Sequence, residues 1–221
     1  MLGRPFAAER YCEFCRTAEE ADQKEHEWLA LWARVGVPKG CERCTFESFE
    51  PAAGTDTAVA VCKQWVKEYR AGTSLRRGLI LRGKPGAGKT HLAIAMLHQL
   101  VWSEHPRSAL FINVPQWLDA LRESYGEGEP PPSPSGFDIV VLDDLGAEDW
   151  SSAWTRDRIY QILNHREQEQ LLMIVTTNCS WNELAGRLGG ASVSRLRRLC
   201  RDVEVDARQD FREILVERNA A

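Results

Sequence analysis

The octapeptide GKPGAGKT, residues 83–90, matches the pattern G-x-x-x-x-G-K-T at every fixed position. The short apolar run GLILRG (78–83) leads into it, and THLAIAMLHQLVW (90–102) follows with helical periodicity. A glycine-rich loop between a strand and a helix can surround phosphate groups with backbone N–H donors, and the positive end of the helix points at the same charge. The stretch therefore predicts an α/β fold that binds a nucleoside triphosphate.

The residue types of the loop explain their expected roles. Gly86 and Gly88 permit the backbone angles and the close approach that phosphate binding needs. The ammonium group of Lys89 can reach the outer phosphates, and the hydroxyl of Thr90 suits Mg²⁺. We therefore expect ATP and Mg²⁺ as cofactors, with a continuous run of cofactor-binding residues: Gly83, Lys84, Pro85, Gly86, Ala87, Gly88, Lys89, Thr90 and His91.

Two later apolar runs end in polar side chains. In IVVLDD (139–144), we expect Asp143 to hold Mg²⁺ directly or through water, and Asp144 to orient or deprotonate the attacking water. In MIVTTN (173–178), Asn178 would polarise that water beside the γ-phosphate. The structural alternative is that these residues only cap turns. P-loop enzymes of this class mostly carry glutamate in place of Asp144, and the shorter carboxylate favours slow hydrolysis.

The rest of the chain alternates between helical and apolar extended segments. We expect helices over residues 18–35, 55–71, 90–102, 115–125, 152–170 and 186–201, strands over 78–83, 109–114, 137–144, 171–178 and 203–205, and a proline-rich loop over 126–136. Apolar strands separated by helices predict a parallel, doubly wound, five-stranded sheet between helices, with ligands at the carboxyl ends of the strands.

Composition excludes several classes of protein. The chain has 221 residues and a net charge of −4, so any nucleic-acid site must be a local patch rather than a property of the whole surface. No apolar run approaches the length of a membrane span, and the N-terminus lacks the apolar centre of a secretory signal. Seven cysteines without the dense spacing of a secreted scaffold favour the reducing cytoplasm.

The motifs together resemble one family. GKPGAGKTHLA, IVVLDDLG, MIVTTN, SRL and QDFR, with the lead-in GVPKGCERCTFESF, are similar to the AAA+ ATPases of the DnaC/DnaI helicase-loader group, with the IstB transposition helpers as close kin. The resemblance covers roughly residues 36–215 and implies a P-loop AAA+ core. It also implies Mg²⁺-dependent ATP hydrolysis, weak in the isolated chain and stimulated by DNA or by oligomerisation.

Two arginines acquire roles through this resemblance. Arg195 matches the arginine finger, which reaches the nucleotide of a neighbouring subunit, so the resemblance implies a homo-oligomer. Arg212 matches the sensor-2 arginine, which contacts the nucleotide of its own subunit. A guanidinium offers fixed, paired donors to phosphate oxygens, which suits both roles. Solvated helix arginines are the alternative, and Arg197 or Arg198 could replace Arg195 as the finger.

The resemblance also implies partners. The leading interpretation is a replication protein that binds the replicative DNA helicase and loads it onto single-stranded DNA. The second is an IstB-like helper that binds DNA and ATP and recruits a transposase. The third is an assembly switch that binds ATP with little turnover, which Asp144 in place of glutamate keeps open. No lid or acceptor site of a metabolite kinase is evident.

The first 50 residues differ from the remainder. Cys12, Cys15, Cys41 and Cys44 form two CxxC pairs, which can present four thiolates to a tetrahedral Zn²⁺. His26 could replace one of these ligands, and ordinary buried thiols are the alternative. We therefore expect an N-terminal partner-binding module over residues 1–50 and an ATP-binding domain over residues 51–221. Cys62, Cys179 and Cys200 are expected to be single buried thiols.

The segment after the second strand is the candidate DNA contact. Single-stranded DNA sites combine positive charge with aromatic platforms. We expect the contact among Asn113, Gln116, Trp117 and Arg122, and the proline-rich loop (126–136), Trp150 and Trp154 are further candidates. Trp117 is equally suited to the hydrophobic core.

Overall fold

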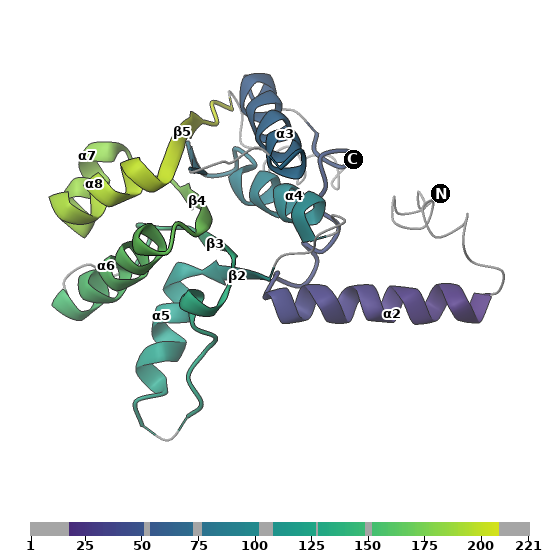
Figure 1. The fold of residues 1–221 in the computed structure, drawn as a ribbon, viewed down its shortest axis with the longest axis horizontal. Coiled ribbons are helices and arrows are strands. Elements are labelled where there is room, and N and C mark those ends of the chain that lie inside the picture. The colour runs from purple at the N-terminus through teal and green to yellow at the C-terminus, as the bar shows by residue number, and fades with distance from the viewer. Residues whose placement is uncertain are drawn as a thin grey trace, which may run out of the picture.

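A parallel sheet of five strands forms the centre of the molecule (Figure 1). The computed structural model describes residues 18–50, 54–72, 77–101, 108–126, 128–148 and 152–207. The strands are β1 (Gly78–Arg82), β2 (Ala109–Asn113), β3 (Ile139–Asp143), β4 (Leu172–Thr177) and β5 (Cys200–Glu204), in the order β2-β3-β4-β1-β5. Every pairing is parallel, so all carboxyl ends lie at one edge. The predicted doubly wound sheet is confirmed.

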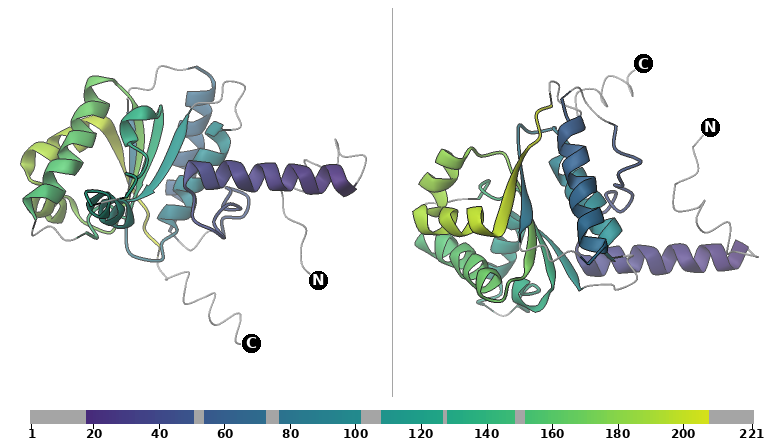
Figure 2. Two further views of the ribbon diagram at one scale, coloured as in Figure 1. Left: turned by 90° about the horizontal axis from the view of Figure 1, so that it is seen from below. Right: turned by 45° about the horizontal axis from the view of Figure 1, so that its top comes forward.

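Helices cover both faces of this sheet (Figure 2). On one face lie α3 (Asp56–Arg70) and α4 (Lys89–Val101); on the other lie α5 (Val114–Glu123), α6 (Ala153–Gln168), α7 (Trp181–Leu188) and α8 (Gly190–Leu199). Successive strand residues point to opposite faces. Leu79 and Leu81 therefore join the first cluster and Ile80 the second, and all three are buried. Burial on both faces explains why the strands read as continuous apolar runs.

The segment before α3 packs on the α4 side of the sheet. Its helix α2 (Ala18–Val35) spans the predicted range and projects away from the body (Figure 1). Its C-terminal half is anchored through the buried residues Trp28, Trp32 and Val35, which share one hydrophobic cluster with α4. Nearer the N-terminal end of the described side chains, Glu25 pairs with Arg43 at 2.6 Å. The lead-in, residues 36–50, continues across α4. The domain division at residue 50 stays a prediction.

One predicted helix is wrong. Residues 186–201 do not form a single helix, because the chain turns at Gly189, whose φ of 83° lies in the left-handed region. Gly189 ends α7 and begins α8, a role for which glycine is favoured. The last strand also begins earlier than predicted, at Cys200. Among the described helices, none is both long and apolar enough to cross a membrane.

A buried arginine fixes the end of the proline-rich loop. Arg166 of α6 has no exposed surface, and its guanidinium donates to main-chain carbonyls of residues from η1 (Pro134–Gly136) to the start of β4. The acceptors are the carbonyl oxygens of Pro134 at 2.9 Å, Phe137 at 3.1 Å and Asp138 at 2.8 Å, together with that of Leu172. Arg166 therefore ties the loop to both α6 and β4.

Candidate nucleotide-binding site

The loop between β1 and α4 has the backbone that the sequence predicts. Gly86 and Gly88 adopt φ angles of 73° and 87°, which side-chain-bearing residues rarely adopt. The chain enters α4 at Lys89, so the N-terminal N–H groups of this helix face the loop. The Lys89 side chain is buried, and its Nζ donates to the carbonyl oxygen of Lys84 at 2.7 Å. The ammonium group of Lys89 thus contacts the loop main chain next to the N-terminus of α4, and a cation at a helix N-terminus suits phosphate binding.

A hydroxyl and a carboxylate meet beside this loop. Thr90 Oγ1 donates to Asp143 Oδ1 at 2.8 Å, which joins the first turn of α4 to the end of β3. Thr176 Oγ1, from β4, donates to the same oxygen at 2.7 Å. The side chain of Asn113 also hydrogen-bonds to Asp143, its neighbour in the β2–β3 register. Asp143 is therefore held by donors from three different elements.

The donor set at Asp143 fits a Mg²⁺ ion. Mg²⁺ binds oxygen ligands, usually one or two carboxylates together with phosphate and water. The oxygen atoms of Thr90 and Asp143 supply such ligands next to the phosphate loop. Burial raises the pKa of Asp143, with the charge of Asp144 adding to this, while hydrogen bonds from Thr176, Thr90 and Asn113 oppose the shift. A buried carboxyl group of this kind gains a partner for its charge when a cation binds.

The other two predicted catalytic side chains occupy the neighbouring strand ends. Asp144 follows β3 directly and adopts a left-handed conformation with φ 57°, with its N–H donating to Thr176 Oγ1 at 2.9 Å. Asn178 follows β4 directly and is exposed. Because β4 lies between β3 and β1 in the sheet, Asn178 lies between the acidic pair and the phosphate loop. The structure thus brings Thr90, Asp143, Asp144 and Asn178 to one edge.

The lead-in forms a part of the site that sequence reasoning missed. The ring of Phe49 lies against the phosphate loop, where a Cβ added to Gly88 would meet Phe49 Cε2 at 2.6 Å. The ring of His91 contacts this segment: its Nε2 lies 2.8 Å from the carbonyl oxygen of Thr45, and Phe49 packs edge-on at 5.2 Å between ring centroids. The nucleotide contact of His91 stays a prediction. His91 and His98 stand at the two ends of the apolar run LAIAML within α4, and these polar residues are the signal that could have indicated contacts with the lead-in.

Glu148, which follows the acidic pair Asp143 and Asp144, is a second residue that the sequence analysis does not single out. Its Oε2 accepts the N–H of Gly146 at 2.7 Å, and Arg187 donates to the carbonyl oxygen of Gly146. Burial raises the pKa of Glu148 to about 7, while Arg187 lowers it and Asp144 raises it. The spacing from Asp144 gives no sequence pattern that could have identified it.

The C-terminal chain passes beside the start of the phosphate loop. The N–H of Val205 donates to the carbonyl oxygen of Arg82 at 2.7 Å, and a Cβ on Gly83 would meet the carbonyl oxygen of Val205 at 2.2 Å. The described chain ends two residues later, at Ala207. The predicted sensor residue Arg212 lies outside the described residues, five positions further along.

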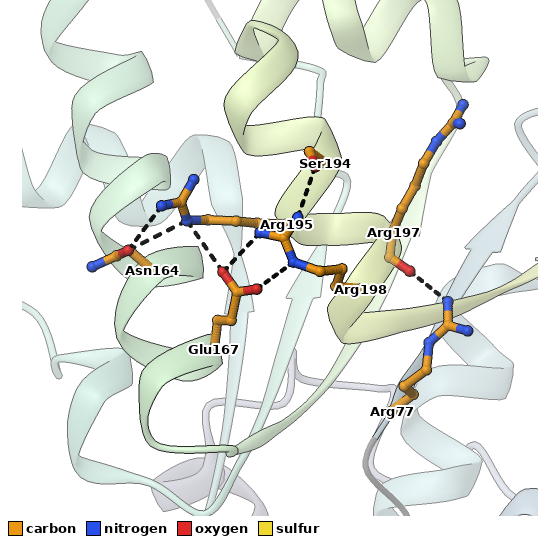
Figure 3. A network of polar contacts seen from close by, with 7 residues as sticks. All are labelled: Arg77, Asn164, Glu167, Ser194, Arg195, Arg197 and Arg198. Atoms are coloured by element: carbon orange, nitrogen blue, oxygen red, sulfur yellow. Dashed lines mark hydrogen bonds and ion pairs between the residues drawn. The ribbon is translucent and has the colours of Figure 1, made fainter.

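Arg195 is bound to its own subunit in this structure. Its guanidinium stacks over the ring of Tyr160 at 4.5 Å and donates to Asn164 Oδ1 at 3.1 Å. Glu167 lies 3.3 Å from Arg195 and 2.5 Å from Arg198, and Figure 3 shows both guanidinium groups meeting at this carboxylate. The neighbouring Arg197 stacks over Trp181 at 4.7 Å. The trans role of Arg195 stays a prediction.

Half of the predicted zinc site is described. Cys41 and Cys44 are partly buried free thiols that hydrogen-bond to each other, and the N–H of Cys44 donates to the carbonyl oxygen of Cys41 at 3.0 Å. Cys12 and Cys15 lie outside the described residues. Within the described part of the chain, no three side chains of His, Cys, Asp or Glu gather as a metal site, so neither the four-cysteine site nor the use of His26 has support here.

The residues that we expect to contact DNA make different contacts in the structure. Asn113 contacts Asp143 and caps α5, accepting the N–H of Gln116 at 3.4 Å. Trp117 is partly buried and donates to the carbonyl oxygen of Pro132 at 3.0 Å, so it holds the proline-rich loop. Arg122 stacks over Trp154 at 4.9 Å. Gln116 is exposed, and Trp150 lies outside the described residues.

The fold and the site together define an ATP-binding P-loop protein of the AAA+ class. Comparison with known proteins supports this class: the chain belongs to the family of IstB-like ATP binding proteins, whose sequence model matches residues 57–209.

Two curated proteins and one crystal structure are similar to this chain. The Replicative helicase loader DnaC of Escherichia coli strain K12 is 25% identical over 186 residues, which cover 81% of this chain and 74% of that protein. The Replicative helicase loader DnaI of Bacillus subtilis strain 168 is 32% identical over 124 residues, 54% of this chain and 39% of that protein. The crystal structure of the DnaC helicase loader superposes with a TM-score of 0.65 and 25% identity, covering 76% of this chain and 100% of that one. The predicted resemblance to DnaC/DnaI-type AAA+ loaders is confirmed.

Proposed function

We propose that the protein hydrolyses ATP in a Mg²⁺-dependent reaction. The observation that supports the proposal is the Thr90–Asp143 hydrogen bond beside the phosphate loop, because a hydroxyl and a carboxylate at such a loop suit a Mg²⁺ ion bound to the phosphates. Bound Mg²⁺ supplies charge neutralisation at the phosphates. Lys89 and the loop N–H groups hold the phosphates, Asp144 accepts a proton from the attacking water, and Asn178 orients that water.

The hydrolysis is proposed to depend on neighbouring subunits. Arg195 acts in trans on the nucleotide of the next subunit, and Arg212 acts in cis. The path of the chain supports the second role, because five residues beyond Ala207 can span about 17 Å and Val205 already contacts Gly83. The contacts of Arg195 within α6 and α8 then belong to the unassembled subunit.

We infer that the work of this ATPase is to bind a replicative DNA helicase and load it onto single-stranded DNA. The similarity to DnaC over 81% of the chain supports this inference. The N-terminal segment, with zinc held by Cys12, Cys15, Cys41 and Cys44, is the proposed helicase contact. The paired thiols of Cys41 and Cys44 could supply half of the four ligands that Zn²⁺ prefers.

Co-purification tests the loader function. The tagged chain would be co-expressed with the replicative helicase of its host and sized with ATP and with ADP, beside a Cys12→Ser/Cys15→Ser chain. We expect a complex with the unmodified chain and its loss in the double variant. A chain that hydrolyses ATP but forms no complex in either nucleotide state contradicts helicase loading and leaves the ATPase proposal intact.

A second candidate is favoured by the family match, whose members are named for IstB. An IstB-like transposition helper would bind duplex DNA with ATP and recruit a transposase. Filaments on duplex DNA in the presence of ATP, seen by electron microscopy together with no helicase complex, would favour this function. The third candidate, an assembly switch, requires ATP binding with turnover near zero even with single-stranded DNA present.

A further inference from the structure

The last two residues of β4 are buried threonines with fully paired hydroxyl groups. Thr176 and Thr177 have no exposed surface. Buried hydroxyls need partners, and here the partners are Asp143 at the end of β3 and residues of the turns that follow β3 and β4. Thr177 Oγ1 donates to the carbonyl oxygen of Leu145 at 2.5 Å and accepts the N–H of Cys179 at 3.0 Å. The pair therefore joins the two turns that carry Asp144 and Asn178.

The Thr176 hydroxyl bridges both aspartates. It donates its single proton to Asp143 Oδ1 at 2.7 Å and accepts the N–H of Asp144 at 2.9 Å. A threonine hydroxyl has one donor and two lone pairs, so these two bonds fix its orientation. The same residue's carbonyl oxygen accepts the N–H of Leu145 at 2.9 Å, which holds the next peptide of the turn.

The backbone of Asp144 needs this support. Its φ of 57° is a left-handed conformation, which is unfavourable for residues with a side chain and persists where surrounding bonds determine it. The two hydrogen bonds to Thr176 flank Asp144, one at its own N–H and one at the N–H of Leu145. The direction in which the Asp144 carboxylate leaves the main chain thus depends on Thr176.

We propose that Thr176 is a positioning residue of the nucleotide site, which orients Asp143 toward Mg²⁺ and Asp144 toward the attacking water. This role rests on the proposed ATPase function. Strand packing alone does not require a hydroxyl at this position, because valine fills the same volume and favours strands equally well. The hydroxyl makes its two bonds to the acidic pair and to nothing else among the described residues.

The test compares Thr176→Val, which removes both bonds, with Thr176→Ser, which keeps them. Thr155→Val is the matched control, because Thr155 is another fully buried threonine whose hydroxyl accepts from Arg122 rather than contacting the nucleotide site. Each 221-residue chain is assayed for kcat and KM in basal ATP hydrolysis, for binding of a fluorescent, non-hydrolysable ATP analogue during a Mg²⁺ titration, and for its thermal midpoint.

Loss of an outer partner of a metal ligand typically costs 10–100-fold in activity or metal affinity. We therefore expect Thr176→Val to lower kcat at least about tenfold and to raise the half-saturating Mg²⁺ concentration by a similar factor. Analogue binding at saturating Mg²⁺ is expected to stay near that of the unmodified chain, because Lys89 and the loop amides remain. Thr176→Ser restores both values, and Thr155→Val changes neither.

Two results would overturn the proposal. One is a folded Thr176→Val chain whose kcat and Mg²⁺ dependence match those of the unmodified chain. The other is a Thr155→Val chain whose kcat and Mg²⁺ affinity fall as much as those of Thr176→Val. If the unmodified chain binds Mg²⁺ and the analogue but never hydrolyses ATP, the ATPase proposal fails, and the Mg²⁺ titration alone decides the role of Thr176. A Thr176→Val chain that unfolds is replaced by Thr176→Cys, whose weak thiol donor should give intermediate values.

Discussion

The imidazole of His98 packs against the indole of Trp32 in a tilted arrangement, with ring centroids 4.1 Å apart and an interplanar angle of 41°. His98 belongs to α4 and Trp32 to α2, and the Nε2 of His98 lies 2.7 Å from the carbonyl oxygen of Glu42 in the lead-in. One buried side chain of the phosphate-binding helix therefore contacts both parts of the N-terminal segment. Because its Nε2 faces a carbonyl oxygen, this nitrogen carries a proton, and the ring is neutral where it is buried.

This neutral ring predicts an acid-sensitive fold. Burial lowers the pKa of His98 to about 4, whereas an unfolded histidine titrates near 6.5. Between these values the unfolded chain binds more protons, so the free energy of unfolding falls as the pH drops, by up to about 1.4 kcal/mol per pH unit from this group. Urea unfolding at several pH values between 4 and 7 measures the slope.

His98→Phe is the control for that slope, because phenylalanine keeps the ring packing and does not titrate. The raised pKa of Glu148, about 7, acts in the opposite direction, but it is common to both chains and cancels in their difference. Parallel pH curves for the two chains would show that His98 is not responsible.

Gly88→Ala is expected to weaken ATP binding at least about tenfold. A Cβ at this position meets the Phe49 ring at 2.6 Å, and φ 87° adds strain of about 1–2 kcal/mol. Gly40→Ala is the matched control, since Gly40 has φ 86° with open space around it. The control should lose stability without losing affinity. Equal affinities for both variants by fluorescence titration would refute the role of the loop backbone.

Arg166→Met is expected to lower the free energy of unfolding by about 3 kcal/mol or more. The change leaves buried carbonyl oxygens of the loop before β3 and of Leu172 without their donor. Arg156→Met, on an exposed position of the same helix, should change stability by no more than about 0.5 kcal/mol. Chemical denaturation of both variants gives the comparison, and similar losses in the two would argue against the anchoring role of Arg166.

Arg195→Ala is expected to leave ATP binding intact and to lower turnover, since a finger arginine is worth on the order of 10³ in kcat. A mixing experiment separates trans from cis action. Lys89→Ala subunits cannot hold ATP but keep the finger, so mixing them with Arg195→Ala subunits should restore turnover above the sum of the two. No recovery on mixing contradicts a trans role, and the same mixture with Arg197→Ala or Arg198→Ala tells which arginine acts.

The proposed four-cysteine site predicts about one zinc ion per chain. Mass spectrometry of protein purified in metal-free buffer measures this content. Cys41→Ser should release it, because a tetrahedral site loses one of its four ligands. Cys62→Ala, which removes a buried thiol of α3, should retain it. Equal zinc contents in the two variants would show that the paired thiols of Cys41 and Cys44 hold no metal.

The sequence predicted those features that depend on local residue pattern. The phosphate loop, the acidic pair after β3 and the polar end of β4 each combine an apolar strand with a defined motif, and parallel topology brings them to one edge. The extent of α2 was also predictable, since Trp28, Trp32 and Val35 recur at helical spacing.

Features that depend on contacts between distant segments were not predictable. The β2–β3 register places Asn113 opposite Asp143, a neighbour that no local pattern indicates, while its expected DNA contact stays a prediction. Gly189 interrupts a segment whose arginine-rich composition favours one continuous helix, and a single glycine inside a helical pattern does not decide between a packing role and a break. The contact of Phe49 with Gly88 joins residues far apart in the chain, which periodicity cannot reveal.

The buried residues of α2 lie toward its C-terminal end, so a tilt of the helix about that end moves its other end farthest. The helix has 18 residues, which corresponds to a length of about 27 Å. A rotation of about 10° at that pivot displaces the far tip by about 5 Å. Because the buried residues of α2 pack in the same hydrophobic cluster as α4, a tilt of α4 that carried α2 with it would be amplified at the far end of α2.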